Sequence, residues 1–187
     1  MVDSHGSIAG VVDSVNRRIV RFFDMLETKS NNGIYLMFLS RTLIILIPIL
    51  IAYAFEEDST RYEHKDLDIF RDRAETILEG DLLYRDTEHV TLSPPLINYL
   101  FVPAVLLGNT ALVWTCWFAT FIFISSVVLY HILLGLFDKR YAIAGAVFFI
   151  TSPFSNYTTI MMMQDDAIIV SFLLLAFLFI IRKSWYK

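Results

Sequence analysis

The stretch TALVWTCWFATFIFISSVVLYHILLGLF, from Thr110 to Phe137, decides the fold class because it contains no Asp, Glu, Lys or Arg. About 20 apolar residues in a row are enough for a helix to cross the hydrocarbon layer of a bilayer. The whole chain of 187 residues is 56% hydrophobic, and its mean hydropathy is +0.58. Soluble domains rarely have this composition. We therefore predict an all-α integral membrane protein.

Two further regions can supply spanning helices. The first is GIYLMFLSRTLIILIPILIAYAF, and the second is a longer apolar region that Asp165 and Asp166 interrupt. We predict four transmembrane helices over 33–55, 110–137, 141–163 and 167–181, followed by a tail at 182–187. Arg41 lies inside the first span, where it either snorkels to the near interface or acts as a functional intramembrane charge.

The segment PPLINYLFVPAVLLG, residues 94–108, is apolar but short for a span, and the positive-inside rule decides its place. If it lies along the outer surface, every basic cluster next to a span falls on the cytoplasmic side. Those clusters are Arg17, Arg18, Arg21 and Lys29; Lys139 and Arg140; and Arg182, Lys183 and Lys187. We therefore expect a multi-pass cell-membrane protein with both termini cytoplasmic and the loop 56–109 outside.

The first 32 residues carry no apolar signal core. Within them, Val15, Ile19 and Phe22 alternate with arginines, which predicts an amphipathic helix on the cytoplasmic surface. A poorly ordered lead-in is the alternative. The lone Cys116 excludes a disulfide within one chain and fits a small apolar filler. The net charge of −4 gives no basic face for a nucleic acid.

The loop between the first two spans holds twelve of the nineteen Asp and Glu residues. In residues 66–79, Phe70, Ala74 and Ile77 recur at helical spacing, and Gly80 fits the position that ends such a helix. A second helix is expected over 94–107, with Ser93 as its N-cap, Pro94 at its first helical position and a kink at Pro103. The loop is thus predicted to form two juxtamembrane helices.

Carboxylates at the mouth of a membrane bundle can act as a general base toward an acceptor hydroxyl. Cationic neighbours such as Lys65, Arg71, Arg73, Arg85 and His89 can hold a phosphate. A solvated acidic surface is the simpler interpretation of the same loop. Two adjacent carboxylates at a membrane edge, Asp165 and Asp166, are also costly enough to indicate a role, although they fit a hydrated helix end as well.

The order of these features resembles the first third of the GT-C integral-membrane glycosyltransferases, in particular the branch that uses polyprenyl-phosphate-mannose. The matching residues are Asp66-Leu67-Asp68-Ile69-Phe70, Glu79-Gly80, Leu83-Tyr84 and Pro94-Pro95-Leu96, and the similarity runs from about Arg41 to the C-terminus.

The resemblance implies that Asp66 is the catalytic base, with Asp68 as second choice, because the D-x-D form is shifted relative to the aromatic residue. It implies a second acidic site at Asp166, with Asp165 beside it. Arg71, Arg85 and His89 are the expected donor-phosphate ligands, and no metal or other cofactor is expected.

The expected reaction transfers a hexose, mannose by resemblance, from a polyprenyl phosphate to an acceptor hydroxyl outside the cytoplasm. Enzymes of this family have more spans than the four predicted here. The chain is therefore a fragment, one half of a split enzyme or a minimal relative, and a second chain supplying the missing helices is an expected partner. The alternative is a non-catalytic four-helix subunit that binds a partner or a lipid phosphate.

Overall fold

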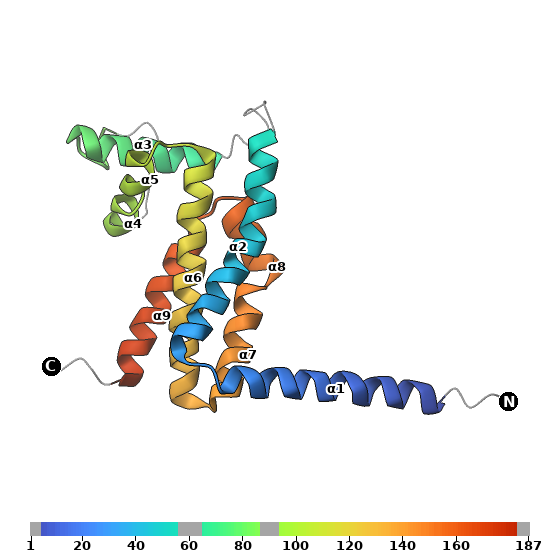
Figure 1. Ribbon diagram of the computed structural model, residues 1–187. Coiled ribbons are helices and arrows are strands. Elements are labelled where there is room, and N and C mark those ends of the chain that lie inside the picture. Colours follow the sequence, from blue (N-terminus) through green and yellow to red (C-terminus); the bar gives the residue numbers. More distant parts are fainter. Residues whose placement is uncertain (1–4, 56–64, 87–93, 183–187) are drawn as a thin grey trace.

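The computed structural model describes residues 5–55, 65–86 and 94–182, and this part of the chain is helical without a strand (Figure 1). His89, Ser93 and residues 183–187, which carry some of the sequence predictions, lie outside the described residues. The helices in chain order are α1 (His5–Glu27), α2 (Asn31–Phe55), α3 (Lys65–Glu79), α4 (Pro95–Tyr99), α5 (Val102–Leu106), α6 (Ala111–Leu136), α7 (Lys139–Ile150), α8 (Pro153–Asn156), η2 (Tyr157–Met161) and α9 (Asp166–Arg182).

Helix α6 forms the centre of a bundle and packs against α2, α7 and α9. Figure 1 shows these helices running along one long axis, with neighbours in the chain alternating in direction. The α6 residues Trp114, Phe118, Ile122 and Ser125 are buried at helical spacing, so one stripe of this apolar helix meets its neighbours. Thr110 caps the helix by accepting a hydrogen bond from the Val113 N–H at 3.3 Å.

The two ends of the bundle differ in charge. One end, called here the basic end, carries Lys29, Lys139, Arg140 and Arg182 at the helix termini. Helix α1 extends from this end, crosswise to the bundle (Figure 1). The opposite end, called here the acidic end, carries α3 with its many carboxylates. The acidic residues 66–81 and the basic helix junctions are thus separated along the length of the bundle.

The predicted helix over 66–79 is confirmed as α3. It ends in a Schellman arrangement, in which the Gly80 N–H donates to the Ile77 carbonyl and the Asp81 N–H donates to the Thr76 carbonyl. Gly80 has a φ of +82°, a conformation that favours glycine. The residue expected to end the helix therefore ends it, and for the expected reason.

The predicted helix over 94–107 is interrupted and forms α4 and α5, with a turn at Leu100 and Phe101 between them. Pro103 lies in the first turn of α5 and has no N–H to donate to the carbonyl one turn earlier. A kink was expected at Pro103, and the structure instead has a break in the helix just before it. The expected helix start, with Ser93 as N-cap and Pro94 as first helical residue, is wrong by one position: Pro94 is the N-cap of α4, and Pro95 is its first helical residue.

The region 141–163, expected as one helix, is also interrupted. Helix α7 ends at Ile150, Ser152 adopts an extended conformation, and Pro153 starts the short helix α8, which continues into the π-helical turn η2. The cause is local, because a proline disfavours the helical conformation of the residue before it. The fourth predicted helix is confirmed as α9, which begins one residue earlier than expected, at Asp166.

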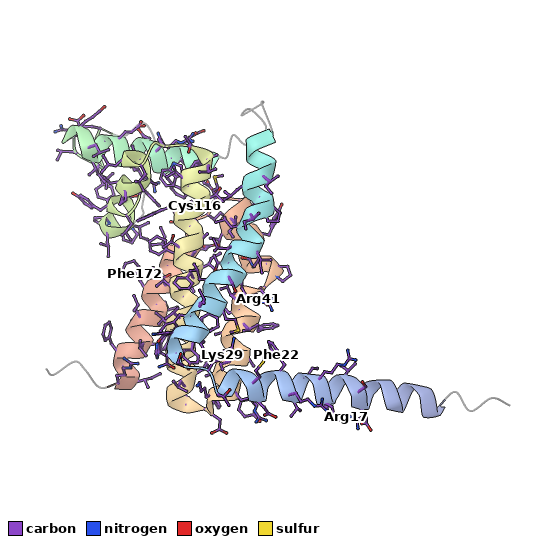
Figure 2. The ribbon with its side chains drawn as sticks, viewed as in Figure 1. Arg17, Phe22, Lys29, Arg41, Cys116 and Phe172 are labelled. Atoms are coloured by element: carbon purple, nitrogen blue, oxygen red, sulfur yellow. The ribbon has the colours of Figure 1, made fainter. Side chains whose placement is uncertain are left out.

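By length and composition, two helices of the described residues could cross a membrane, Asn31–Ile51 within α2 and Ala111–Leu136. Their outer surfaces are apolar: Leu36, Ile44 and Ile51 on α2 are at least half exposed. Phe172 likewise lies on the outer side of α9 (Figure 2). These apolar helices indicate an association with a lipid bilayer.

Candidate catalytic site at the acidic end of the bundle

Two acidic segments that are far apart in the sequence interact at the acidic end. Asp66 lies in the first turn of α3, and Asp165 directly precedes α9. The charges of Asp166, Arg73 and Asp66 all act on the Asp165 carboxylate. The two groups of carboxylates singled out in the sequence therefore act on each other electrostatically, and the charge of Arg73 acts on Asp165 with the opposite sign.

Asp66 and Asp68 are both exposed, whereas Leu67 between them is buried. Asp68 accepts a hydrogen bond from Arg71 Nη1 at 3.5 Å, one turn further along α3. No such ion pair to Asp66 is found among the described residues. The first turn of a helix is also where the backbone N–H groups favour negative charge. Asp66 and Asp68 thus lie in the same helical turn, but only Asp68 has an ion pair among the described residues.

Phe70 fixes the start of α3 to the bundle. Its ring stacks on Phe101 with centroids 4.4 Å apart, and it also contacts Trp114 and Phe118 of α6. All four side chains are buried. Because Phe70 lies one turn after Asp66, this aromatic cluster sets the height of the Asp66 carboxylate above the bundle.

Arg73 joins the two juxtamembrane segments. Its Nη1 donates to Asn98 Oδ1 of α4 at 3.3 Å, and both residues are buried. Burial lowers the pKa of Arg73, and the nearby carboxylate of Asp165 opposes this effect. An arginine remains protonated in proteins, so a permanent positive charge lies inside this site.

Arg71, expected as a donor-phosphate ligand, contacts the loop before α6. Its Nε donates to Asn109 Oδ1 at 3.0 Å, and its Nη2 donates to the Asn109 carbonyl at 3.3 Å. Asn109 in turn donates to Glu75 Oε1 at 3.0 Å and accepts from Trp114 Nε1 at 2.9 Å. Arg71 therefore helps to hold α3 on the bundle, beside its pair with Asp68.

Asn109 was not singled out by the sequence analysis. It has a φ of +53°, directly after Gly108 with a φ of +124°. Asparagine tolerates this left-handed conformation better than most residues. The Gly-Asn pair between two apolar segments was the available signal for a turn, but nothing in it indicated four hydrogen bonds with the side chains of Arg71, Glu75 and Trp114.

Arg85 forms an ion pair with Asp86, at 2.6 Å between Nε and Oδ1. This pair raises the pKa of Arg85 and lowers the pKa of Asp86, and both groups are on the surface. The backbone N–H of Leu82 also donates to Asp86. Arg85 thus closes a local turn after α3, and His89 lies outside the described residues.

The segment between η2 and α9 has an unusual backbone. Residues 157–161 form a π-helical turn, and the buried Met163 has a φ of +49°. Such departures from regular geometry cluster at functional sites. The carboxyl that follows them is perturbed as well: burial and then repulsion from Asp166 raise the pKa of Asp165.

A pocket of about 240 Å³ opens next to this segment. Its walls come from α6, α7, α8, η2 and α9, and Asp166 lies among its lining residues. The lining combines apolar side chains with the hydroxyls of Ser125, Ser155, Thr158 and Thr159. This composition suits a small polar group attached to an apolar body.

The described residues contain no group of three or more His, Cys, Asp and Glu side chains that could hold a metal ion. The acidic end presents carboxylates, the buried Arg73 guanidinium and the hydroxyls of the pocket lining. Comparisons of the chain with protein-family models, with curated proteins and with solved structures found no match.

Proposed function

We propose that the chain is a membrane-embedded hexosyltransferase, or the N-terminal part of one, that uses a polyprenyl-phosphate donor. The observation that carries the proposal is that the charges of Asp66 and of Arg73 both act on Asp165 at one end of an apolar bundle. Two carboxylates beside a fixed positive charge, at the edge of a bilayer, suit the transfer of a sugar from a lipid-linked phosphate to a hydroxyl.

In the proposed reaction, the Asp66 carboxylate accepts the proton of the acceptor hydroxyl. The acceptor oxygen forms a bond to the anomeric carbon of the sugar. The bond from that carbon to the phosphate oxygen breaks, and its electron pair leaves with the lipid phosphate. Attack and departure occur on opposite faces of the sugar, so the anomeric configuration inverts. The positive charge of Arg73 favours the negative charge that develops on the phosphate.

Asp66 is preferred to Asp68 as the base because Asp68 is paired with Arg71. That ion pair holds the Asp68 carboxylate against Arg71, whereas no such pair holds Asp66 among the described residues. Arg71 and Arg85 remain the proposed contacts for the donor phosphate, as does His89. The pocket beside Asp166 is the proposed place for the apolar part of a substrate, with Asp166 and the hydroxyls toward its polar end.

The proposed topology has four passes, formed by α2, α6, the interrupted segment α7–η2, and α9. Alternating helix directions support it, as does the separation of the basic end from the acidic end. In this arrangement the basic end faces the cytoplasm. A cysteine at Lys187, in a Cys116→Ser background, should resist an impermeant thiol reagent added from outside, and labelling from outside would overturn the topology.

The test of the activity is a transfer assay with a synthetic mannosyl-phosphoryl-polyprenol and a hydroxyl acceptor. Loss of a general base lowers a rate by about 10²–10⁴-fold, so Asp66→Asn should lose transfer to that extent while inserting normally. Asp68→Asn is the matched control and should keep most of the activity. Full activity of Asp66→Asn would remove this residue from the mechanism, and inactivity of Asp68→Asn alone would assign the base to Asp68.

A second candidate function is that of a non-catalytic subunit bound to another membrane chain. The exposure of Arg41 favours it, because this charge lies in the middle of an apolar helix that could cross a bilayer. A charge in that position is stabilised by snorkelling or by a carboxylate of a partner helix. Absence of transfer by the chain alone, and its recovery only with a partner, would support a split enzyme. Absence under both conditions would favour the subunit.

A further inference from the structure

A single charged side chain lies within α2. Arg41 is the only Asp, Glu, Lys or Arg of this helix, and it is exposed. Figure 2 shows it on the part of α2 between the two ends of the bundle. It lies midway along Asn31–Ile51, the part of α2 that could cross a membrane, about 15 Å from either end at 1.5 Å per residue. Since the hydrocarbon layer is about 30 Å thick, Arg41 lies at the depth of its centre.

The length of an arginine side chain limits how far snorkelling can relieve this charge. Side chains on a helix lean toward its N-terminus, which for α2 is at the basic end of the bundle. Counted from Gly33, the first residue after the two asparagines, the depth along the helix is still about 12 Å. An arginine side chain is shorter than this, so leaning brings the guanidinium nearer to the surface but leaves it in the apolar layer.

The described part of the chain offers Arg41 no counter-charge. No hydrogen bond or ion pair of Arg41 is found there. Helix α6 contains no Asp or Glu, α7 is preceded by Asp138 at the basic end, and α9 has Asp166 only as its first residue. The carboxylates of the described bundle thus lie at its ends, away from the depth of Arg41.

Arg41 belongs to an exposed face of α2. Ile44, Pro48 and Ile51 follow it at spacings of three, four and three, so the four residues share one side of the helix. All four are exposed, whereas Thr42, next to Arg41 in the chain, is buried toward the bundle. These four residues are called here the Arg41 face, which is apolar except for one positive charge at its edge.

We propose that the Arg41 face binds a transmembrane helix of a different chain, and that a carboxylate in the middle of that helix pairs with Arg41. An opposite charge at the same depth is what stabilises a charged side chain inside a bilayer. A second copy of this chain does not fit, because a symmetric contact through this face would place Arg41 beside Arg41. The inference rests on the membrane arrangement put forward above, but not on transfer activity, and it gives the partner chain a chemical identity.

The test uses a synthetic transmembrane peptide of leucine and alanine, about 22 residues long, with Glu at its central position. The matched peptides carry Leu or Gln there, and the central position has the same depth in either orientation. Full-length protein with Cys116→Ser and a donor fluorophore on Asn32→Cys is reconstituted with acceptor-labelled peptide in phosphatidylcholine vesicles. Energy transfer measures binding. A separate probe on Leu173→Cys, on the exposed side of α9, reports insertion through quenching by nitroxide-labelled lipid.

We expect the protein to bind the Glu peptide about 3–20-fold more tightly than the Leu peptide, the range that corresponds to polar contacts between helices in membranes. Arg41→Leu should remove this preference while the Leu173→Cys probe is quenched as before, because leucine suits the apolar layer. Arg182→Leu removes a charge at the end of the bundle and is the matched control, so it should keep the preference.

Equal binding of the Glu and Leu peptides by inserted protein would overturn the inference and leave Arg41 to snorkelling. Binding of the Gln peptide as tightly as the Glu peptide would refute the need for a carboxylate. Energy transfer between two copies of the protein that Arg41→Leu abolishes would identify a second copy as the occupant instead. A Leu173→Cys probe that labelled lipid does not quench would overturn the membrane arrangement itself.

Discussion

Arg73 of α3 donates a hydrogen bond from Nη1 to Oδ1 of Asn98 in α4 across 3.3 Å, and both side chains are buried. This contact connects the helix that carries Asp66 with the segment that follows the loop. The same guanidinium interacts with Asp165, so Arg73 links three parts of the chain at the acidic end.

Replacing Asn98 with Ala should destabilise the protein by about 1.5–3 kcal/mol, because the hydrogen bond to a charged group is lost inside the protein. The measurement is an unfolding titration in detergent micelles. Asn32→Ala, at an exposed asparagine of α2, is the control and should change stability little. Equal effects of the two substitutions would show that the buried contact contributes nothing of its own.

Phe70→Ala should cost about 3–5 kcal/mol, because it removes the central ring of a buried aromatic cluster and leaves a cavity. It should also release α3 from the bundle, which protease sensitivity of the segment 65–86 would report. Leu78→Ala on the same helix is the control, since that side chain is 44% exposed. A protease pattern unchanged from the wild type would show that α3 is held mainly by Arg71 and Asn109.

Ser171→Ala should cost about 0.6–1.7 kcal/mol, the range for hydrogen bonds between helices in membranes. The Ser171 hydroxyl lies 2.7 Å from the Ser125 hydroxyl and donates to the Phe121 carbonyl at 2.9 Å, so it connects α9 to α6. Thr120→Ala is the control, because that hydroxyl bonds only within α6. The same unfolding titration measures both, and an equal loss for Thr120→Ala would contradict the interhelical contribution.

The raised pKa of Asp165 predicts a dependence of stability on pH. Its folded-state pKa lies above the value of about 3.9 expected for an unfolded chain, so the folded state holds the proton more firmly. The contribution is complete below the unfolded value and is lost as the pH rises through the folded one. Asp165→Asn should therefore raise the melting temperature near neutral pH and leave it unchanged in acid.

Thermal unfolding over a pH series tests this prediction for the wild type and for Asp165→Asn. The control is an Asp166→Asn background, which removes the neighbouring charge. In this background the change in melting temperature caused by Asp165→Asn should be smaller. A lower melting temperature of Asp165→Asn at neutral pH would show that attraction to Arg73 outweighs the cost of burial.

The sequence allowed α2, α3, α6 and α9 to be predicted, because their causes are local. The regions 94–107 and 141–163 were expected as single helices and are interrupted. Apolar composition over 110–137 predicts a helix that the structure shows as α6. The spacing of Phe70, Ala74 and Ile77 and the left-handed Gly80 predict α3 and its end. The break before Pro153 has a local cause as well, because a proline disfavours the helical conformation of the residue before it.

The contacts between elements were decided by the tertiary structure alone. The charge of Asp66 acts on Asp165 because Phe70 holds α3 on Phe101 and α6 while the π-helical turn and Met163 position the start of α9. No spacing in the sequence predicts that Asp66 and Asp165 act on each other, because this depends on how α3 and α9 pack on the bundle. Composition and periodicity thus determined an all-helical, strongly apolar chain, whereas packing determined which of its charges share a site.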